Sequence, residues 1–294
     1  ILGHYYQKGE IQDIADFVGD SLALAREAAK TEAKVMVMCG VHFMAETCKL
    51  LSPEKTVLSP DLTAGCSLAD SCKAEDLRKF KEEHPGYEVV SYVNTTAAVK
   101  ALTDVVVTSG NAKKVIDSIP KDTKLIFGPD YNLGSYINSV TGRNMLLWNG
   151  GCHVHERFSV AEIVKLKEQH PEAVVMAHLE CKAPVLAAAD VKGSTATMLH
   201  YAQDHPEVKE FIVATEAGIL HEMQRTRPNQ TFLPVPPEVT EGGRGCACTE
   251  CEYMKKNTLK KVYNALKYGW PAVEVDPAIA RDAVKPIERM LSLS

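Results

Sequence analysis

The sequence predicts an α/β protein made of three similar three-layer αβα domains related by pseudo-threefold symmetry. The first observation behind this prediction is a polar pattern that begins at His4, Tyr92 and His178. In each copy a polar residue follows two positions on (Tyr6, Asn94, Glu180), an aspartate twelve positions on (Asp16, Asp104, Asp190) and a hydroxyl residue seventeen positions on (Ser21, Ser109, Thr195). A repeat at this long, fixed spacing indicates repeated domains.

The second observation is a block of 26 residues that recurs without gaps at 35–60, 125–150 and 211–236. Each copy reads as strand, turn, helix and strand. Beyond each copy lies a cysteine close to glycines, namely Cys66, Cys152 and the group Cys246, Cys248 and Cys251. We expect domains at 1–68, 69–154 and 155–270, with 271–294 completing the first domain.

The third observation is the alternation of short β-rich runs with helical patterns. Apolar and β-branched runs predict strands at 1–3, 35–39, 56–58, 88–93, 104–108, 124–127, 145–148, 173–177, 211–214 and 231–233. Apolar residues at helical spacing predict helices at 11–29, 42–51, 73–84, 96–102, 111–118, 133–140, 159–170, 183–188, 195–204 and 216–226. Such alternation favours parallel sheets, which bind ligands outside the carboxyl ends of their strands. We therefore expect the active site at the centre, where the three sheets would meet.

The two ends of the chain differ from the internal copies. The first copy starts at Ile1, inside a predicted strand, whereas the other copies have a helix ahead of that strand. The segment 257–276 resembles this helix and strand, and it follows Cys251 as they follow Cys66 and Cys152. We therefore expect the tail to supply the helix and close a ring of three domains.

Composition narrows the classes of function. The chain is 45% hydrophobic and 24% charged, with a formal net charge of −5 and without long runs of Lys and Arg. Proteins that bind nucleic acid or anionic membranes usually carry a basic patch, so the sequence disfavours both partners. No apolar run approaches the roughly 20 residues of a membrane helix, and no secretory signal is recognisable. We expect a cytoplasmic enzyme.

Cysteines at matching places in the three copies suggest a metal centre. Three thiolates that converge on one point leave a coordination position open, as catalytic metal sites do. Thiolate ligands favour zinc or an iron–sulfur cluster, and a 4Fe-4S cluster with one open iron would suit dehydration chemistry. Zinc remains an alternative, and so does a set of merely buried cysteines. In the third copy we choose Cys251, because it precedes a short segment and a helix as Cys66 and Cys152 do; Cys246 and Cys248 would be spare thiols able to form a reversible disulfide.

Polar residues after the predicted strands could provide acid, base and anion-binding groups. Glu180 follows an apolar strand, so we expect burial to raise its pKa and suit it to proton transfer. His4, His155 and His178 could shuttle protons or bind carboxylates. Hydroxyl residues that open helices could cap them or bind anionic groups of a substrate, and both roles stay open.

A resemblance to one known family is carried by the stretches 4–7, 11–26, 40–53, 92–97, 108–112, 126–134, 150–155, 178–181, 193–195, 214–221 and 251–259. Together these stretches resemble quinolinate synthase, the iron–sulfur enzyme family of de novo NAD biosynthesis. The resemblance implies condensation of iminoaspartate with dihydroxyacetone phosphate to quinolinate, with loss of phosphate and water. It also implies a functional link to L-aspartate oxidase or aspartate dehydrogenase, which would supply iminoaspartate.

The resemblance also assigns site residues. Cluster ligands would be Cys66, Cys152 and Cys251, and catalytic residues would be Glu180, Tyr6, His178 and His4. Substrate-binding residues would be Ser21, Tyr92, Asn94, Ser109, His155, Ser194 and Thr195. Two other classes remain open from the residues themselves: a 4Fe-4S hydro-lyase that acts on hydroxyacids, and a non-catalytic zinc-binding scaffold.

Overall fold

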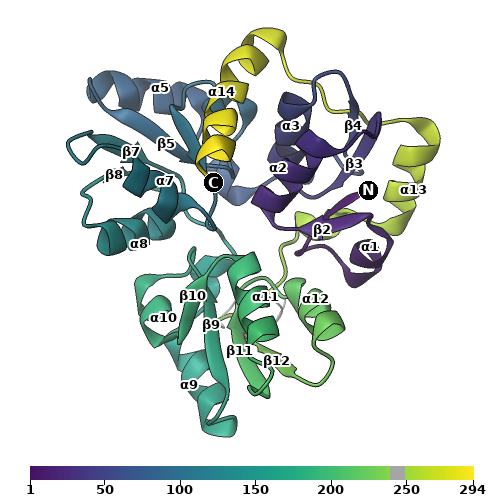
Figure 1. Ribbon diagram of the computed structural model, residues 1–294, viewed down its shortest axis with the longest axis vertical. Helices are drawn as coiled ribbons and strands as arrows, with labels where there is room; N and C mark the ends of the chain where they lie inside the picture. The colour runs from purple at the N-terminus through teal and green to yellow at the C-terminus, as the bar shows by residue number, and fades with distance from the viewer. Residues whose placement is uncertain (239–248) are drawn as a thin grey trace.

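The computed structural model describes residues 1–238 and 249–294. It contains three four-stranded parallel sheets arranged about a common centre (Figure 1). The strand orders are β2-β1-β3-β4, β6-β5-β7-β8 and β10-β9-β11-β12, so all three sheets are built in the same way. Helices lie on the faces of each sheet. The predicted α/β class is confirmed, and the shared strand order is what the predicted pseudo-threefold arrangement requires.

The elements follow the chain through the three sheets in turn. The first sheet and its helices are β1 (Leu2–His4), α1 (Gly9–Ile14), β2 (Phe17–Gly19), α2 (Ser21–Lys30), β3 (Val35–Cys39), α3 (His42–Leu51), β4 (Thr56–Leu58) and α4 (Ser67–Asp70). The second set is α5 (Ala74–Glu83), β5 (Glu88–Tyr92), α6 (Ala97–Lys100), β6 (Val105–Val107), α7 (Ala112–Ser118), β7 (Leu125–Phe127), α8 (Tyr131–Thr141) and β8 (Leu146–Leu147). The third is η1 (His155–Arg157), α9 (Val160–Gln169), β9 (Val174–His178), α10 (Ala183–Ala188), β10 (Val191–Gly193), α11 (Thr195–Asp204), β11 (Glu210–Ala214), α12 (Ile219–Thr226) and β12 (Thr231–Pro234).

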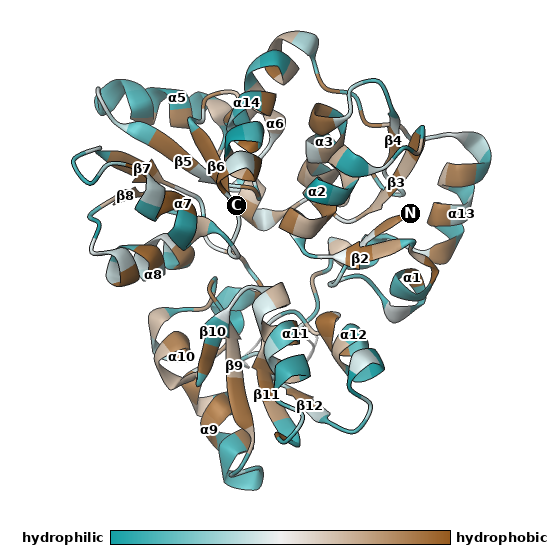
Figure 2. Cartoon of the chain, viewed as in Figure 1, coloured by the Kyte–Doolittle hydropathy of each residue, from teal (hydrophilic) through white to brown (hydrophobic). Residues whose placement is uncertain are grey.

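The inner strands form the core of each unit. Strand β6 reads Val-Val-Val and is fully buried, and most of β5, β9 and β11 is buried as well. Parallel strands covered by helices on both faces are expected to be almost wholly apolar. Figure 2 shows hydrophobic residues along these strands and hydrophilic residues on the outer faces of the helices.

Two edge strands were missed by the sequence analysis. Strand β2 lies inside the predicted helix 11–29, which is in fact α1, β2 and α2, and no strand was predicted at β10. Both have only three residues and end in glycine, so neither shows a clear β-rich run. Each pairs in parallel with the first strand of its unit, as β6 pairs with β5.

The repeated aspartates brace the starts of strands. The Oδ2 atom of Asp104 accepts the N–H of Val89 at 2.7 Å, and Oδ2 of Asp190 accepts the N–H of Val175 at 2.8 Å. Both bonds lie at the amino ends of the sheets, away from the strand ends that carry the predicted site. This member of the repeated pattern is therefore structural.

The C-terminal segment returns to the first two units. After η2 (Met254–Lys256), α13 (Leu259–Tyr268) packs beside β3, with Val262 and Ala265 buried against the core that includes Val37. Ala272 forms an antiparallel bridge with Leu58. Helix α14 (Pro277–Leu293), to which no sequence pattern was assigned, packs against α6, β6 and α3. The helix expected within 257–276 thus lies beside the first sheet, while the domain boundaries at 68, 154 and 270 stay a prediction.

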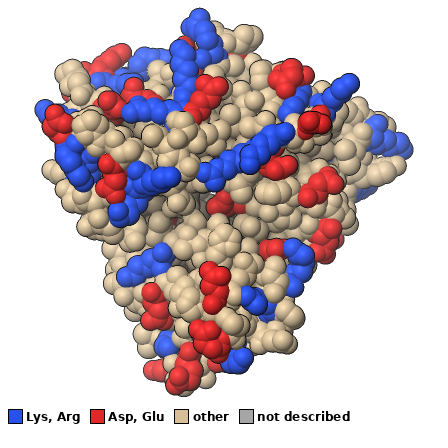
Figure 3. Space-filling model, viewed as in Figure 1, with Lys and Arg blue, Asp and Glu red and all other residues tan. Residues whose placement is uncertain are grey.

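The distribution of surface charges and the character of the helices bear on the classes of partner considered from the composition. Acidic and basic side chains are interspersed over the face shown in Figure 3. Among the helices of the described residues, none combines the length and the apolar character needed to cross a membrane.

Candidate active site

A central cavity lies where the three units meet, with about 720 Å³ of empty space, including the part open to solvent. The lining includes all the predicted site residues except one: His4, Tyr6, Ser21, Cys66, Tyr92, Asn94, Ser109, Cys152, His155, His178, Glu180, Thr195 and Cys251. The exception, Ser194, lies behind the lining and caps α11, where its Oγ accepts the N–H of Thr197 at 3.2 Å.

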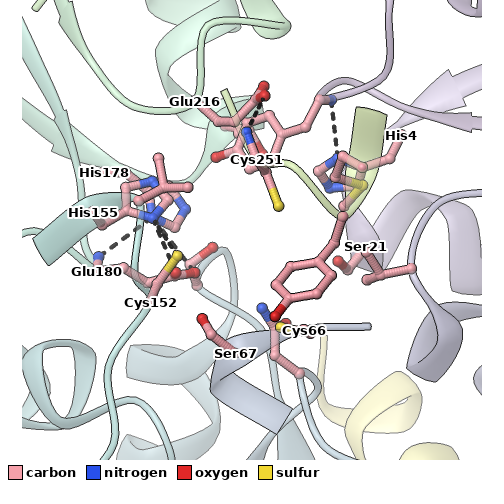
Figure 4. Close-up of a pocket in the computed structure, with 18 of the residues that line it drawn as sticks. His4, Ser21, Cys66, Ser67, Cys152, His155, His178, Glu180, Glu216 and Cys251 are labelled. Carbon is pink, nitrogen blue, oxygen red and sulfur yellow. Dashed lines mark hydrogen bonds and ion pairs between the residues drawn. The ribbon is translucent and has the colours of Figure 1, made fainter. Parts of the chain in front are cut away.

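Three cysteines, one from each unit, line this cavity with their sulfur atoms directed inward (Figure 4). Cys66 directly precedes α4, while Cys152 and Cys251 stand shortly before the single turns η1 and η2. Cys66, Cys152 and Cys251 are free thiols. The other predicted thiols of this region, Cys246 and Cys248, lie outside the described residues.

The three sulfur atoms have matching surroundings. Burial raises the pKa of each thiol, to about 12 for Cys66 and well above the usual value for Cys152. The backbone N–H groups two and three positions further on oppose this effect in every case, namely those of residues 68 and 69, 154 and 155, and 253 and 254. N–H groups that favour thiolate at three converging cysteines are well suited to a soft metal centre.

Cys152 also belongs to a compact group with His155 and Glu180. The potential ligand atoms of these three residues all lie within 4.8 Å of one another. Nδ1 of His155 is 3.1 Å from Sγ of Cys152 and 3.1 Å from Oε2 of Glu180. Sulfur, imidazole and carboxylate are also the ligand types of a catalytic zinc site.

A chain of polar contacts runs from Tyr6 to Glu180 through a residue that the sequence analysis missed. The hydroxyl of Tyr6 is 2.7 Å from Oγ1 of Thr215, and the same Oγ1 is 2.9 Å from Nε2 of His155. Nδ1 of His155 then reaches Glu180. Because one atom of each residue contacts the next, the four side chains can pass a proton without water. Thr215 is the first residue after β11, and only its place at a strand end could have marked it.

Glu180 is ionised, in contrast to the prediction from its sequence position. Burial raises the pKa of this carboxyl, but His155, His178 and the hydroxyl of Tyr92 outweigh burial and hold the pKa below its usual range. The hydroxyl of Tyr92 donates to Oε1 of Glu180 at 2.6 Å. The expected rise in pKa is therefore wrong, because the partners that stabilise the carboxylate come from other parts of the chain.

His4 and His178 have the same local geometry in two copies of the repeat. Nδ1 of His4 accepts the backbone N–H of Tyr6 at 3.1 Å, and Nδ1 of His178 accepts that of Glu180 at 3.3 Å. Burial lowers the pKa of His4 to about 3 and that of His178 to about 4. Both rings are thus neutral near pH 7, and their proton is on Nε2, since Nδ1 is an acceptor.

The repeated hydroxyl residues do not act as helix caps. Asp20 caps α2 through Oδ1, so Ser21 occupies the first helical position, and Thr195 likewise follows the capping Ser194. The alternative reading of these hydroxyls as N-caps is therefore wrong for Ser21 and Thr195. Their side chains line the cavity at the N-terminal ends of two helices, a setting that favours anions.

Several further cavity residues were not predicted. They are Asp20, Val41, Phe43, Gly65, Ser67, Thr108, His153, Val154, Glu216, Tyr253 and Met254. Ser67 and His153 directly follow two of the cysteines, and Oγ of Ser67 is 2.8 Å from Nδ1 of His153. Glu216 follows Thr215, and its Oε1 accepts the N–H of Cys251 at 2.9 Å.

Comparisons with known proteins agree with this site. The family model "Quinolinate synthetase A protein" matches residues 1–292. Quinolinate synthase of Trichormus variabilis (strain ATCC 29413 / PCC 7937) is 53% identical over 294 residues, which cover 100% of this chain and 89% of that protein. The proteins of the same name from Nostoc punctiforme (strain ATCC 29133 / PCC 73102) and Synechococcus sp. (strain ATCC 27144 / PCC 6301 / SAUG 1402/1) are 53% and 50% identical over all of this chain, covering 89% and 90% of those proteins. The chain therefore belongs to the quinolinate synthase family, whose members are enzymes of NAD biosynthesis.

Proposed function

We propose that this protein condenses iminoaspartate with dihydroxyacetone phosphate to quinolinate, with loss of phosphate and water, in the central cavity. The observation that carries the proposal is the meeting of three cysteines from three units with the polar chain from Tyr6 to Glu180 in one cavity. The family supports the product, and the geometry supports where the chemistry occurs.

We infer that Cys66, Cys152 and Cys251 hold a 4Fe-4S cluster. The donor set fits such a group, because three free thiols with matching N–H surroundings line one buried cavity. Held by three cysteines, the cluster would supply one iron without a protein ligand as a Lewis acid for dehydration.

The residues of the polar chain would move protons during dehydration and ring closure. Burial raises the pKa of Tyr6 well above its usual value, so its hydroxyl is protonated at rest and can donate to a departing hydroxyl group. If His155 starts as the imidazolium, Thr215 can then return a proton to Tyr6 while it takes one from Nε2 of His155. The neutral imidazole that results keeps its Nδ1–H on the carboxylate of Glu180. The reverse sequence would let Tyr6 accept a proton.

Neutral donors would bind the anionic groups of the substrates. Nε2–H of His4 and of His178 can donate to carboxylates, and the hydroxyls of Ser21 and Thr195 lie at helix N-termini that favour phosphate or carboxylate. Asn94 adds an amide whose Oδ1 is buried without a hydrogen-bond partner among the described residues. Such an unpaired atom is consistent with a substrate partner.

A supply of iminoaspartate would come from an enzyme that oxidises aspartate, either L-aspartate oxidase or aspartate dehydrogenase. Free imines hydrolyse in water, so we expect the two activities to work in the same compartment. This is a functional link, and it needs no stable complex.

An anaerobic assay tests the proposal directly. Purified protein should be brown, hold about four iron and four sulfide per chain, and form quinolinate from the two substrates. Glu180→Gln should abolish turnover while the iron content stays unchanged, because Glu180 acts on protons and not as a ligand. Loss of iron in this variant would instead assign Glu180 to the metal site.

A second candidate is a zinc site formed by Cys152, His155 and Glu180, which the 4.8 Å grouping of their ligand atoms favours. It predicts a colourless protein with about one zinc per chain. In that case Cys66→Ser would leave the metal content unchanged, whereas the cluster requires Cys66. A hydro-lyase for hydroxyacids would in turn dehydrate such acids without dihydroxyacetone phosphate.

A further inference from the structure

Two buried carboxyl groups that were not predicted as site residues each accept the backbone N–H of one of the three cysteines. Asp130 and Glu216 are each the sixth residue of their copy of the 26-residue block, and each stands just after the strand, β7 or β11, that opens the block. Their exposed fractions are 0% and 1%.

Asp130 ties the turn of Cys152 to helix α8. Its Oδ2 accepts the backbone N–H of Cys152 at 3.2 Å, and its Oδ1 accepts the N–H of Leu133 at 2.8 Å. One carboxyl group therefore uses both oxygen atoms to join the glycine-rich segment before Cys152 to the start of a regular helix.

Glu216 does the same for Cys251. Its Oε1 accepts the backbone N–H of Cys251 at 2.9 Å, a contact drawn in Figure 4, and its Oε2 accepts the N–H of Gly218 at 2.7 Å. Nζ of Lys255 lies 2.7 Å from Oε1 and donates to the carbonyl oxygen of Tyr6 at 2.7 Å. The carboxylate thus joins the Cys251 turn to its own unit and, through Lys255, to the strand end that carries Tyr6.

The first unit has no carboxyl group at the matching position of the block. Gly40 stands at the position of Asp130 and Glu216, so no carboxylate can reach Cys66 from there. The carbonyl oxygen of Gly40 accepts Nδ2 of Asn257 at 2.8 Å instead. Cys66 directly precedes α4, and its carbonyl oxygen accepts the N–H of Asp70 at 2.9 Å. The other two cysteines have this turn bond as well, since the carbonyl oxygens of Cys152 and Cys251 accept N–H groups at 2.9 and 3.1 Å.

We propose that Asp130 and Glu216 are positioning residues that hold Cys152 and Cys251 in the geometry needed to bind the metal centre, while Cys66 depends on α4. Ligands bind tightly when neighbouring groups fix their orientation before the metal arrives. The proposal rests on the metal centre assigned under the proposed function. It adds that the three ligands are supported unequally.

Amide variants test this role with little change in shape. In Asp130→Asn and Glu216→Gln only one oxygen remains to accept an N–H, so one of the two backbone bonds is lost in each case. Asp190→Asn is the matched control, because Oδ2 of Asp190 also accepts a backbone N–H, that of Val175, at the opposite end of β9. Asp130→Asn leaves the Glu216–Lys255 pair intact and therefore suffices if Glu216→Gln fails to fold.

The measurement is the rate of iron release to a chelator under anaerobic conditions, followed by visible absorbance, together with the melting temperature. We expect Asp130→Asn and Glu216→Gln to release iron about tenfold faster than the wild type, or more, and Asp190→Asn to release it at the wild-type rate. Equal rates of iron release in all four proteins, or an equal acceleration in Asp190→Asn, would overturn the positioning role of Asp130 and Glu216 but leave the proposed cluster standing. A wild-type protein that takes up no iron would overturn the proposed cluster, and the inference with it.

Discussion

The two ends of each parallel sheet use the polar residues of one repeated pattern in different ways. At the amino end, Asp104 and Asp190 accept backbone N–H groups of the neighbouring strand and have no part in the cavity. At the carboxyl end, the residues from the same pattern line the cavity, and Tyr92 of the second unit donates to Glu180 of the third. Repetition of a polar residue therefore does not by itself mark the cavity, because, of these residues, only those at the carboxyl end of the sheet line it.

The largest effect should come from a cysteine at the cavity end. Cys66→Ser should lose the metal centre and all measurable turnover, because two sulfur atoms cannot hold a cluster that needs three. Iron content and the quinolinate assay measure this. Cys72→Ala is the matched control, since Cys72 is buried outside the cavity and should leave both readings near the wild type. Full iron content in Cys66→Ser would remove Cys66 from the ligand set.

The next effect should come from breaking the polar chain without touching a ligand. Thr215→Val keeps the side-chain shape and removes the oxygen between Tyr6 and His155, so kcat should fall by about 100-fold with iron retained. Thr103→Val, which removes a hydroxyl paired with Ser91 away from the cavity, should change stability only. An unchanged kcat in Thr215→Val would mean that the proton takes another route.

A smaller effect concerns the pH dependence of stability at the cavity end. The pKa of His4 is lowered to about 3 in the folded protein from 6.5, so the unfolded chain binds a proton that the folded protein excludes. Stability from this residue is complete above about pH 6.5 and is lost as the pH falls toward the folded value.

His4→Asn should reduce this loss, because an asparagine oxygen can accept the N–H of Tyr6 without titrating. Urea unfolding of the metal-free protein between about pH 7 and about pH 4 would show a shallower slope of unfolding free energy against pH in the variant than in the wild type. Parallel curves would contradict the assigned burial of His4.

The smallest effect should come from the amino end. Asp104→Ala removes the carboxylate that accepts the N–H of Val89 and should lower the unfolding free energy by about 1 kcal/mol. Iron content and kcat should match the wild type, because the residue lies away from the cavity. A large loss of turnover in the folded variant would erase the distinction between the two ends of the sheet.

Much of the architecture was predictable because periodicity reports local structure. Helix α3 was expected at 42–51 and has those bounds, and β3 and β4 also lie where the apolar runs placed them. The edge strands β2 and β10 were not predicted, because three residues ending in glycine carry too little pattern. Helix α14 escaped prediction because it belongs to no copy of the repeat.

The site residues were predictable where positions of the repeat coincide with strand ends. The sequence prediction failed where contacts between distant segments determine a residue's partners or its pKa. Thr215 contacts Tyr6, 209 residues earlier, and no local pattern records that contact. The same limit explains Glu180: its position next to an apolar strand indicated a raised pKa, while its partners His155 and Tyr92 lie on other segments and reverse the direction. The roles of the cavity residues stay predictions that the variants above address.

The distribution of the three cysteines over three units has a consequence for assembly. A chain with one unit still unfolded presents at most two of the sulfur atoms, so tight uptake of the proposed cofactor would be conditional on completion of the whole ring. By linkage, the bound form would then resist unfolding as a single cooperative body, with no unit melting ahead of the others.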